Sequence, residues 1–198
     1  MKKLSEFIKI NFKNSIFIHF STDQVYWGSG PHKEKNASFG NYYSECKLMG
    51  EKEAKKINSI ILRTNFFGKS NVSKKSFTDW IYSSAKSKEK INLYKDVFFN
   101  PLSIDTLQNI LMYILKHPVL GTYNLGSKGG LSKAEFARKF LKKLHIEIDA
   151  KDVNFSTIQN KAPRPLDMRM NCDLFEKKFK TTLPCLEDEI DRIIPHYI

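Results

Sequence analysis

Residues 15–24 read SIFIHFSTDQ, residues 41–56 read NYYSECKLMGEKEAKK, and residues 59–65 read SIILRTN. The first and third stretches are short β-rich runs of the kind found in strands that are buried on both faces of a sheet. The middle stretch has the length and composition of a helix. A strand, a helix and a second strand in this order are typical of a parallel α/β sheet. We therefore expect an α/β fold.

The rest of the chain predicts further helices and one more strand. Residues 4–12 carry apolar side chains at helical spacing before the first strand. Ser132 and Glu135 form the pattern of a capping box, which predicts a helix through Leu144. We also expect helices at 76–87, 105–116, 173–180 and 186–194, and a short strand at 122–125.

Length and composition favour one compact domain with a substantial core. The chain has 198 residues, of which 41% are hydrophobic and 13% aromatic. Its apolar runs are far shorter than the roughly 18 residues of a membrane span, and its first residues lack the pattern of a signal peptide. We expect no membrane partner and a cytoplasmic location.

The net charge of +12 raises the question of nucleic-acid binding. Only five of the 33 basic residues are arginine, and the lysines are scattered over the whole chain without a basic stripe that alternates with aromatic residues. We therefore expect no nucleic-acid partner. Cys46, Cys172 and Cys185 are odd in number and widely spaced, so we expect neither a disulfide framework nor a metal site.

A candidate catalytic group lies on the helix expected at residues 42–56. Tyr43 and Lys47 are four residues apart, so both side chains leave the same face of that helix. In a Tyr-x-x-x-Lys pair the phenol is the general acid for the oxygen that receives electrons, and the ammonium favours the phenolate form. A hydroxyl at the end of the preceding strand holds the carbonyl oxygen, and Thr22 lies at that position.

The spacing alone carries little weight. Chance gives roughly one Tyr-x-x-x-Lys match in a chain of this composition, and a second match occurs at Tyr82 and Lys86. The first match differs because it follows a strand that ends in Ser21-Thr22-Asp23 and precedes the strand 59–65. We therefore interpret Tyr43 and Lys47 as the functional pair.

Several segments together resemble one family. STDQVYWGSGPHKE, NYYSECKLMGE and ILRTNFFG are similar to segments of the extended short-chain dehydrogenases/reductases, and most similar to the dTDP-4-dehydrorhamnose reductase family. DVFFNPLSIDTL, GTYNLGSKGGLSKAEFARKF and RPLDMRMNCDLF follow in the order of that family. The resemblance covers most of residues 4–195. It departs from the family at Gln24, where an aromatic residue is common, and at Ser44 and Cys46.

The resemblance implies a fold and a division of the chain. It predicts the C-terminal part of a Rossmann-like parallel sheet with a small mixed α/β substrate-binding portion. Residues 1–70 would be the remnant of a Rossmann-type catalytic domain. Residues 71–198 would be mainly the substrate-binding portion, with a returning strand and helix at about 105–126.

The resemblance also implies an activity and its residues. The family transfers hydride from NADPH or NADH to the C4 ketone of a dTDP-linked 4-keto-6-deoxy sugar in nucleotide-sugar biosynthesis. By this resemblance Thr22, Tyr43 and Lys47 are catalytic. Tyr43, Lys47 and Asn65 would bind the cofactor. Substrate contacts would come from Asp23, Gln24, Asn65 and Arg164, with Arg164 near the nucleotide diphosphate.

One expected feature is missing from the sequence. A dinucleotide-binding sheet normally opens with a glycine-rich turn that holds the pyrophosphate at a helix N-terminus, and the 198 residues contain no such turn. Family members carry it within on the order of 80 further residues at their start. The resemblance therefore predicts that this chain alone binds NADPH weakly and is inactive unless a separate N-terminal fragment or a second copy completes it.

Alternative readings remain open. The same residues would serve a fragment of a nucleotide-sugar epimerase or dehydratase. A non-catalytic role is the second alternative, because the regulatory subunit of methionine adenosyltransferase also resembles this family. The joint presence of Thr22, Tyr43 and Lys47 favours an enzyme over that role.

Overall fold

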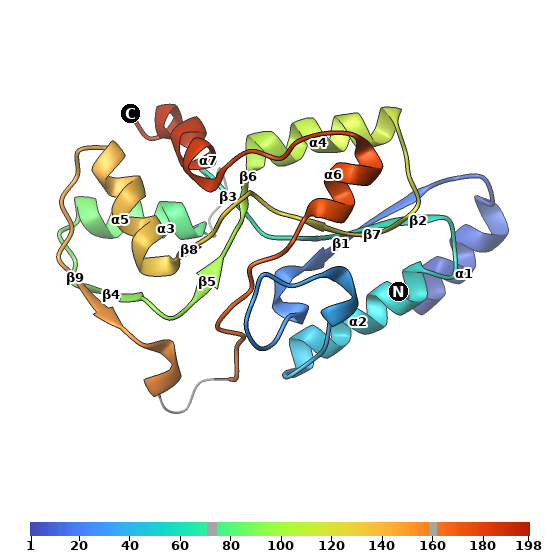
Figure 1. The fold of residues 1–198 in the computed structure, drawn as a ribbon, viewed down its shortest axis with the longest axis horizontal. Helices are drawn as coiled ribbons and strands as arrows, with labels where there is room; N and C mark the ends of the chain where they lie inside the picture. The colour runs from blue at the N-terminus through green and yellow to red at the C-terminus, as the bar shows by residue number, and fades with distance from the viewer. Residues whose placement is uncertain (71–74, 159–161) are drawn as a thin grey trace.

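The computed structural model describes residues 1–70, 75–158 and 162–198. Its main sheet consists of three parallel strands in the order β1 (Phe17–Thr22), β2 (Ser59–Thr64) and β7 (Gly121–Leu125). Thr22 is paired with Thr64, which in turn is paired with Leu125, so the three strands end together at one edge (Figure 1). This edge collects the residues that follow each strand.

Helices cover both faces of this sheet. α4 (Ile104–Lys116) and α6 (Asp173–Phe179) lie on one side of it, and α2 (Tyr42–Ala54) lies on the other (Figure 1). β2 is buried along its whole length, and its side chains alternate between the two faces. Ile60 and Leu62 pack with α4 and α6, whereas Arg63 turns to α2. The predicted Rossmann-like α/β fold is confirmed.

The other half of the molecule holds three short strand pairs. β3 (Phe66–Phe67) pairs with β6 (Leu102–Ser103), and β4 (Ile91–Tyr94) pairs with β9 (Ala150–Val153), both in parallel. β5 (Phe98–Phe99) pairs antiparallel with β8 (Leu131–Ser132). The local sequence pattern predicts none of these short strands, but their presence agrees with the small mixed α/β portion that the family resemblance implies.

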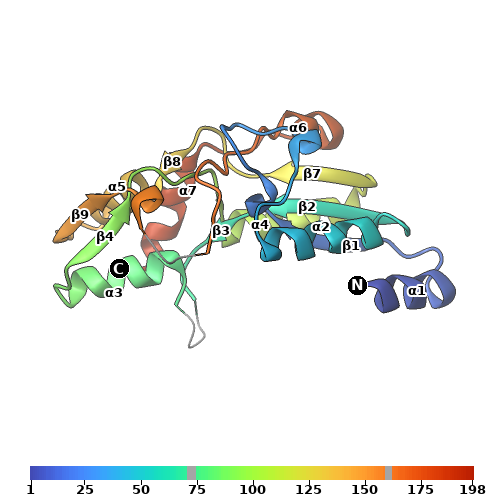
Figure 2. The same cartoon turned by 90° about the horizontal axis from the view of Figure 1, so that it is seen from below.

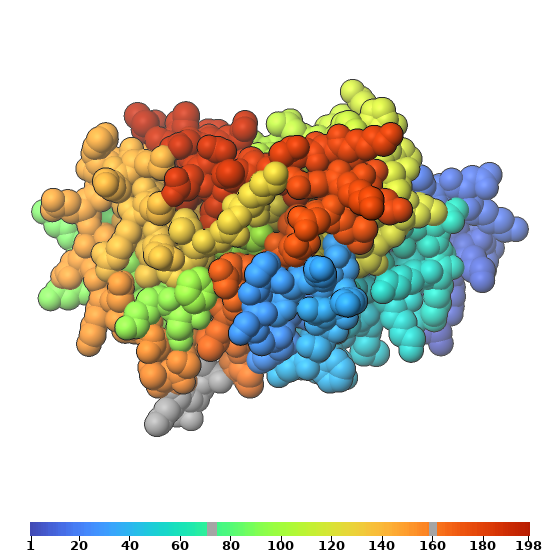
Figure 3. All heavy atoms as spheres, viewed as in Figure 1, coloured from blue at the N-terminus to red at the C-terminus, as the bar shows by residue number. Residues whose placement is uncertain are grey.

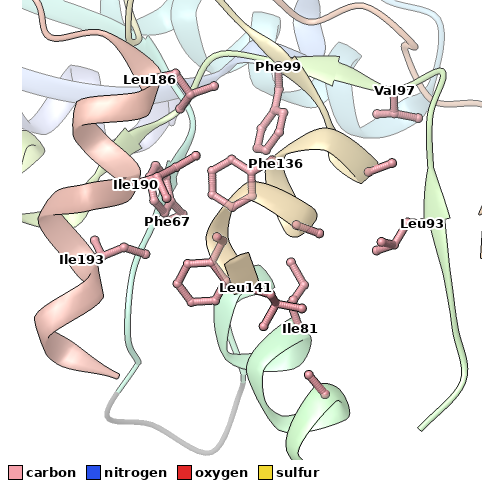
Figure 4. Packing of buried hydrophobic residues seen from close by; sticks show 14 of the residues in the cluster. Phe67, Ile81, Leu93, Val97, Phe99, Phe136, Leu141, Leu186, Ile190 and Ile193 are labelled. Carbon is pink, nitrogen blue, oxygen red and sulfur yellow. The ribbon is translucent and has the colours of Figure 1, made fainter. Parts of the chain in front are cut away.

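α3 (Phe77–Lys86), α5 (Lys133–Lys143) and α7 (Leu186–Ile193) enclose a second hydrophobic core beside these strands. Phe136 lies at its centre and is fully buried. Its ring contacts those of Phe67 and Phe99 at centroid distances of 4.8 and 5.3 Å. Figure 4 shows Phe136 between α7 and the strand side of this core. The core fixes the position of α5, whose first residue, Lys133, lines a cavity.

Capping residues set where the helices begin. Asn41 and Ser44 form a capping box at the start of α2, and Ser76 and Asp79 form one at the start of α3. The box predicted at Ser132 and Glu135 is also present, and α5 begins directly after Ser132. Because α2 starts at a fixed residue, Tyr43 and Lys47 fall in its first two turns.

α1 (Lys2–Asn11) lies at one end of the molecule beyond the sheet, and α3 lies at the other end (Figure 2). The apolar side chains of α1 are largely exposed: Phe7 is 55% exposed and Ile10 is 71% exposed. In the parts of the chain that the structure covers, no helix has the length and apolarity to cross a membrane.

The long segment between β1 and α2 has no regular strand or helix beyond the short 3-10 turns η1 (Asp23–Val25) and η2 (Glu34–Asn36). It packs against the C-terminal segment at His32, which forms an isolated bridge with Met170. Figure 3 shows the two segments, in blue and orange, side by side. The remaining 3-10 turns are η3 (Phe155–Thr157) and η4 (Ile194–His196).

Two elements from the second half of the sequence are part of the layer that β1 and β2 begin. β7 pairs with β2 in the main sheet, and α4 packs against this sheet. The boundary expected between residues 70 and 71 adjoins residues 71–74, which lie outside the described residues. The division into a catalytic and a substrate-binding portion stays a prediction.

Candidate active site

Polar side chains meet where β1 and β2 end. Thr22 is the last residue of β1 and is only 6% exposed. Its hydroxyl accepts a hydrogen bond from the Gln24 amide at 3.2 Å and donates to Asp23 Oδ1 at 3.3 Å. Asn65, just after β2, donates from Nδ2 to Asp23 Oδ2 at 2.7 Å. The Asp23 carboxylate therefore joins the ends of the two strands.

Tyr43 and Lys47 lie one turn apart on α2. The Lys47 Nζ is 5.8 Å from the centroid of the Tyr43 ring, so the two side chains share one face of the helix. Lys47 Nζ also donates to the backbone oxygen of Phe20 on β1 at 3.4 Å. Tyr43 is 47% exposed. The structure thus places the pair beside the strand that ends in Thr22, with the phenol accessible from outside.

A cavity of about 310 Å³ opens beside this strand edge. It brings together three of the substrate-binding residues predicted from the sequence, namely Gln24, Asn65 and Arg164. Its other walls come mainly from aromatic side chains and one lysine. The remaining lining residues are Phe77, Trp80, Tyr94, Val97, Lys133, Phe155, Pro165 and Met168.

The predicted residues divide into two groups. Thr22, Tyr43 and Lys47 are not among the residues that line the cavity, although Thr22 is bonded to Gln24, which does line it. Asp23 is 1% exposed and lies beneath the wall, where it holds Asn65. Asp23 is therefore built to orient Asn65 and Thr22, and its predicted direct contact with substrate stays a prediction.

The charges of Asp23, which is buried, and Lys133, which is half-buried and lines the cavity, influence each other's pKa. Burial raises the pKa of Asp23 to about 6, although the hydrogen bond from Asn65 and the charge of Lys133 oppose this rise. Burial lowers the pKa of Lys133 to about 7, and the charge of Asp23 opposes that fall. The sequence reading missed Lys133, because nothing in the spacing of SKAEF sets it apart from the other lysines.

A buried ion pair fixes α2 against the sheet. Glu51 accepts hydrogen bonds from Arg63 at 2.9 Å (Nε) and 2.6 Å (Nη2), and from the Ser21 hydroxyl at 2.6 Å. The side chains of Arg63 and Glu51 are only 4% and 2% exposed. Burial alone would raise the pKa of Glu51, but the hydrogen bonds and charge of Arg63 outweigh it and hold this pKa below its ordinary value. Glu51 lies two turns beyond Tyr43 on α2, so this ion pair sets the rotation of α2 about its axis.

Arg63 also forms hydrogen bonds with the segment between β1 and α2. Arg63 Nη1 donates to the Tyr26 hydroxyl at 2.9 Å and to the Glu34 backbone oxygen at 2.6 Å. The Tyr26 hydroxyl donates in turn to Asn124 on β7, and Asn124 Nδ2 donates to the His32 backbone oxygen at 2.8 Å. One buried polar network therefore holds all three strands, α2 and the intervening segment.

The second Tyr-x-x-x-Lys match has similar local geometry. Lys86 Nζ is 5.6 Å from the Tyr82 ring centroid, almost the same distance as in the first pair. The Tyr82 ring, however, packs against the second core and lies 5.2 Å from the ring of Tyr197. Pair geometry alone does not distinguish the two matches. The distinction rests on the strand end that adjoins Tyr43.

The three cysteines are all free. Within the described ranges, no group of three or more His, Cys, Asp or Glu side chains is arranged to hold a metal ion. The candidate site therefore consists of the hydroxyls of Thr22 and Tyr43, the ammonium of Lys47 and the adjoining cavity.

The parallel sheet, with helices on both faces and polar residues at its carboxyl edge, defines this chain as a Rossmann-like α/β protein. Residues 9–198 match the family described as the RmlD substrate binding domain. The chain belongs to this family.

Individual relatives agree with this assignment. The dTDP-4-dehydrorhamnose reductase of Escherichia coli K12 is 27% identical over 195 residues, which cover 89% of this chain and 64% of the relative. This chain therefore spans slightly less than two thirds of the length of the curated relatives that it matches.

Solved structures show the same fold. The dTDP-4-dehydrorhamnose reductase of Bacillus anthracis in complex with NADP has a TM-score of 0.83 at 23% identity, over 90% of this chain and 65% of that one. The Yersinia enterocolitica reductase has a TM-score of 0.87 at 19% identity, over 100% of this chain and 71% of that one.

Proposed function

We propose that this chain carries the substrate-binding and proton-donating residues of a reductase that acts on a dTDP-linked 4-keto-6-deoxy sugar. The observation behind the proposal is the Tyr43–Lys47 pair on α2, which lies beside the strand that ends in Thr22. Thr22 is bonded in turn to Gln24, which lines a cavity together with Asn65 and Arg164. The name and 27% identity of the Escherichia coli relative support the reaction class.

The chain's own residues would divide the work as follows. The Thr22 hydroxyl would hold the ketone oxygen, since it lies at the end of β1 beside the cavity. The Tyr43 phenol would donate a proton to that oxygen as negative charge develops on it. Lys47, fixed by its bond to Phe20 O, would stabilise the phenolate that remains.

The cofactor would be NADPH or NADH, which supplies the hydride that adds to the ketone carbon. The Bacillus anthracis relative is a complex with NADP. Lys47 fits the nicotinamide ribose because, among the described residues, its ammonium donates only to Phe20 O, which leaves two N–H groups for ribose hydroxyls. Asn65 lies at the neighbouring strand end. The 198 residues contain no glycine-rich turn for the pyrophosphate, so we propose that this chain alone binds NADPH weakly.

The nucleotide sugar would enter the cavity with its sugar toward Gln24 and Asn65. Arg164 lines the same cavity and would bind the diphosphate, because guanidinium groups recognise phosphate through paired hydrogen bonds. The aromatic walls at Phe77 and Trp80 offer apolar surface for the rest of the ligand.

The test is NADPH oxidation with a dTDP-4-keto-6-deoxy sugar, followed by absorbance. Because we expect the chain alone to be inactive, the assay uses the chain completed with the N-terminal, pyrophosphate-binding portion of a relative such as the Escherichia coli reductase. Tyr43→Phe should lower kcat by about 10²- to 10⁴-fold, the usual contribution of a general acid. Tyr82→Phe is the matched control, because Tyr82 belongs to the second Tyr-x-x-x-Lys match and keeps its ring contacts as phenylalanine. Equal activity of Tyr43→Phe and Tyr82→Phe would show that Tyr43 is not the proton donor.

A fluorescence titration with NADPH tests the cofactor part separately. We expect no saturation of the chain at micromolar NADPH, since the pyrophosphate has no glycine-rich turn to bind. Saturation at micromolar concentration would mean that other residues of this chain hold the pyrophosphate.

A further inference from the structure

Lys133 is placed unusually for a surface lysine. It is the first residue of α5, directly after the capping residue Ser132, and its side chain is half-buried. The Nζ atom lies 3.3 Å from the ring centroid of Phe99 and 4.4 Å from that of Phe77. Both rings therefore present their faces to the ammonium, which lines the cavity together with Gln24 and Asn65.

A purely structural role explains this arrangement poorly. The first turn of a helix favours acidic side chains, because the helix dipole is positive there, and a lysine at this position is disfavoured. The cation–π contacts with Phe99 and Phe77 offset part of the cost of burying the charge. They leave the N–H donors of the ammonium without hydrogen-bond acceptors.

Those donors have no protein partner in the part of the chain that the structure covers. Neither a side-chain hydrogen bond nor an ion pair of Lys133 occurs there, and its backbone N–H donates to Val97 O. A half-buried ammonium with free donors costs free energy until an acceptor reaches it. Because the ammonium lines the cavity, a ligand in the cavity can supply that acceptor.

The position of Lys133 indicates which part of a ligand it would meet. It shares the cavity wall with Gln24 and Asn65, and the charge it interacts with is that of Asp23, which is bonded to Thr22. Thr22 does not line the cavity itself, but it marks the strand end where the ketone would lie in the proposed function. Arg164 is the other cation of the wall, and no carboxylate is found among the described residues that line it.

We propose that the Lys133 ammonium donates hydrogen bonds to an oxygen of the sugar ring of the bound nucleotide sugar and so determines sugar specificity. This inference rests on the proposed function, since it takes the ligand to be a nucleotide sugar. Lys133 favours a sugar that presents a free hydroxyl to the ammonium as hydrogen-bond acceptor. A sugar without a hydroxyl at that position leaves the half-buried ammonium unpaired. Recognition by an otherwise unsatisfied buried donor discriminates strongly, because the wrong ligand leaves that donor desolvated.

Isothermal titration of the full chain with dTDP and with dTDP-rhamnose separates the sugar contact from the nucleotide contact. The wild type should bind dTDP-rhamnose more tightly than dTDP. Lys133→Met should reduce the affinity for dTDP-rhamnose by about 10- to 100-fold, the equivalent of one charge-assisted hydrogen bond, and leave the affinity for dTDP unchanged. Lys128→Met is the control, because Lys128 pairs with Glu176 outside this cavity.

A second measurement is made on the wild-type chain, so its outcome does not depend on Lys133→Met folding correctly. In the wild-type chain with ¹³C-labelled lysine side chains, the Lys133 resonance should shift on addition of dTDP-rhamnose and stay in place on addition of dTDP. The resonance is assigned from its absence in Lys133→Arg.

Each other result overturns the inference. If Lys133→Met leaves both affinities at their wild-type values, Lys133 contacts neither the sugar nor the nucleotide. If it weakens dTDP and dTDP-rhamnose equally, Lys133 binds the nucleotide portion. If the wild type binds neither ligand, the proposed function is wrong, and the inference fails with it.

Discussion

Replacement of Glu51 by glutamine should destabilise the fold strongly. Glu51→Gln keeps the shape of the side chain and removes its charge, so Arg63 loses its counter-ion while it remains buried between α2 and β2. Removal of one partner from a buried ion pair typically costs about 3–5 kcal/mol. For a chain of this length that corresponds to a fall in Tm of roughly 6–20 °C.

Urea unfolding followed by circular dichroism measures this change, and Glu53→Gln is the matched control. Glu53 lies on the same helix and forms an ion pair with Lys56 at 2.7 Å, but the Lys56 side chain is 53% exposed. An exposed pair of this kind contributes little, so Glu53→Gln should leave the unfolding midpoint nearly unchanged. If the two variants unfold at the same urea concentration, the buried network does not hold α2 in place.

The pH dependence of the Glu51 contribution has a definite sign. The pKa of Glu51 is lower in the folded protein than in the unfolded chain, so its stabilisation is fully present above the unfolded pKa of about 4.3 and is lost as pH falls through the folded pKa. The difference in stability between wild type and Glu51→Gln should therefore shrink below about pH 4.

Three further outcomes follow from buried groups. Phe136→Ala should lower the free energy of unfolding by about 3–5 kcal/mol in urea titrations, because it empties the centre of the second core. Asn100→Ala should cost about 1–3 kcal/mol in the same assay, since the Asn100 side chain bonds Ser127 O, Met170 O and Met170 N. Asp23→Asn should stabilise the protein more at pH 7 than at pH 4: the pKa of Asp23 is raised to about 6, so wild-type stability falls as pH rises between the unfolded and folded values. A smaller gain at pH 7 than at pH 4 would contradict the Asp23 reasoning.

The sequence predicted the sheet well because its signals are local. SIFIHFST and SIILRTN are short β-rich runs with no charge except at Arg63, and the stretch between them has the composition of a helix. The helices of the second half were also predicted to within a few residues, because proline and capping residues limit them. α4, for instance, ends at Lys116, just before Pro118.

The short strands could not be predicted in the same way. β9 reads AKDV, which is polar and carries no strand signal of its own. It becomes a strand because β4 pairs with it from far along the chain, a contact that no local pattern encodes.

The candidate site was predictable in part. The proximity of Thr22, Tyr43 and Lys47 could be predicted because they belong to one strand–helix unit, while their catalytic role stays a prediction. Lys133 could not, because it comes from a distant strand–helix junction and only the folded chain brings it to Gln24 and Asn65. Arg63 was visible as a cation within an apolar run, and a buried cation requires an acid nearby, but nothing in the sequence identified Glu51 as that acid.

The network of Arg63, Tyr26 and Asn124 has a consequence for how the protein opens. The segment between β1 and α2 has few backbone ladder bonds, yet buried hydrogen bonds connect Tyr26 to β2 and β7 and the His32 backbone to β7. Local opening of this segment must break the buried network, so its amides share the opening free energy of the sheet instead of fraying as a surface loop does. In native-state hydrogen exchange, the His32 amide, bonded to Arg169 O, would then be protected to nearly the same degree as amides of β2.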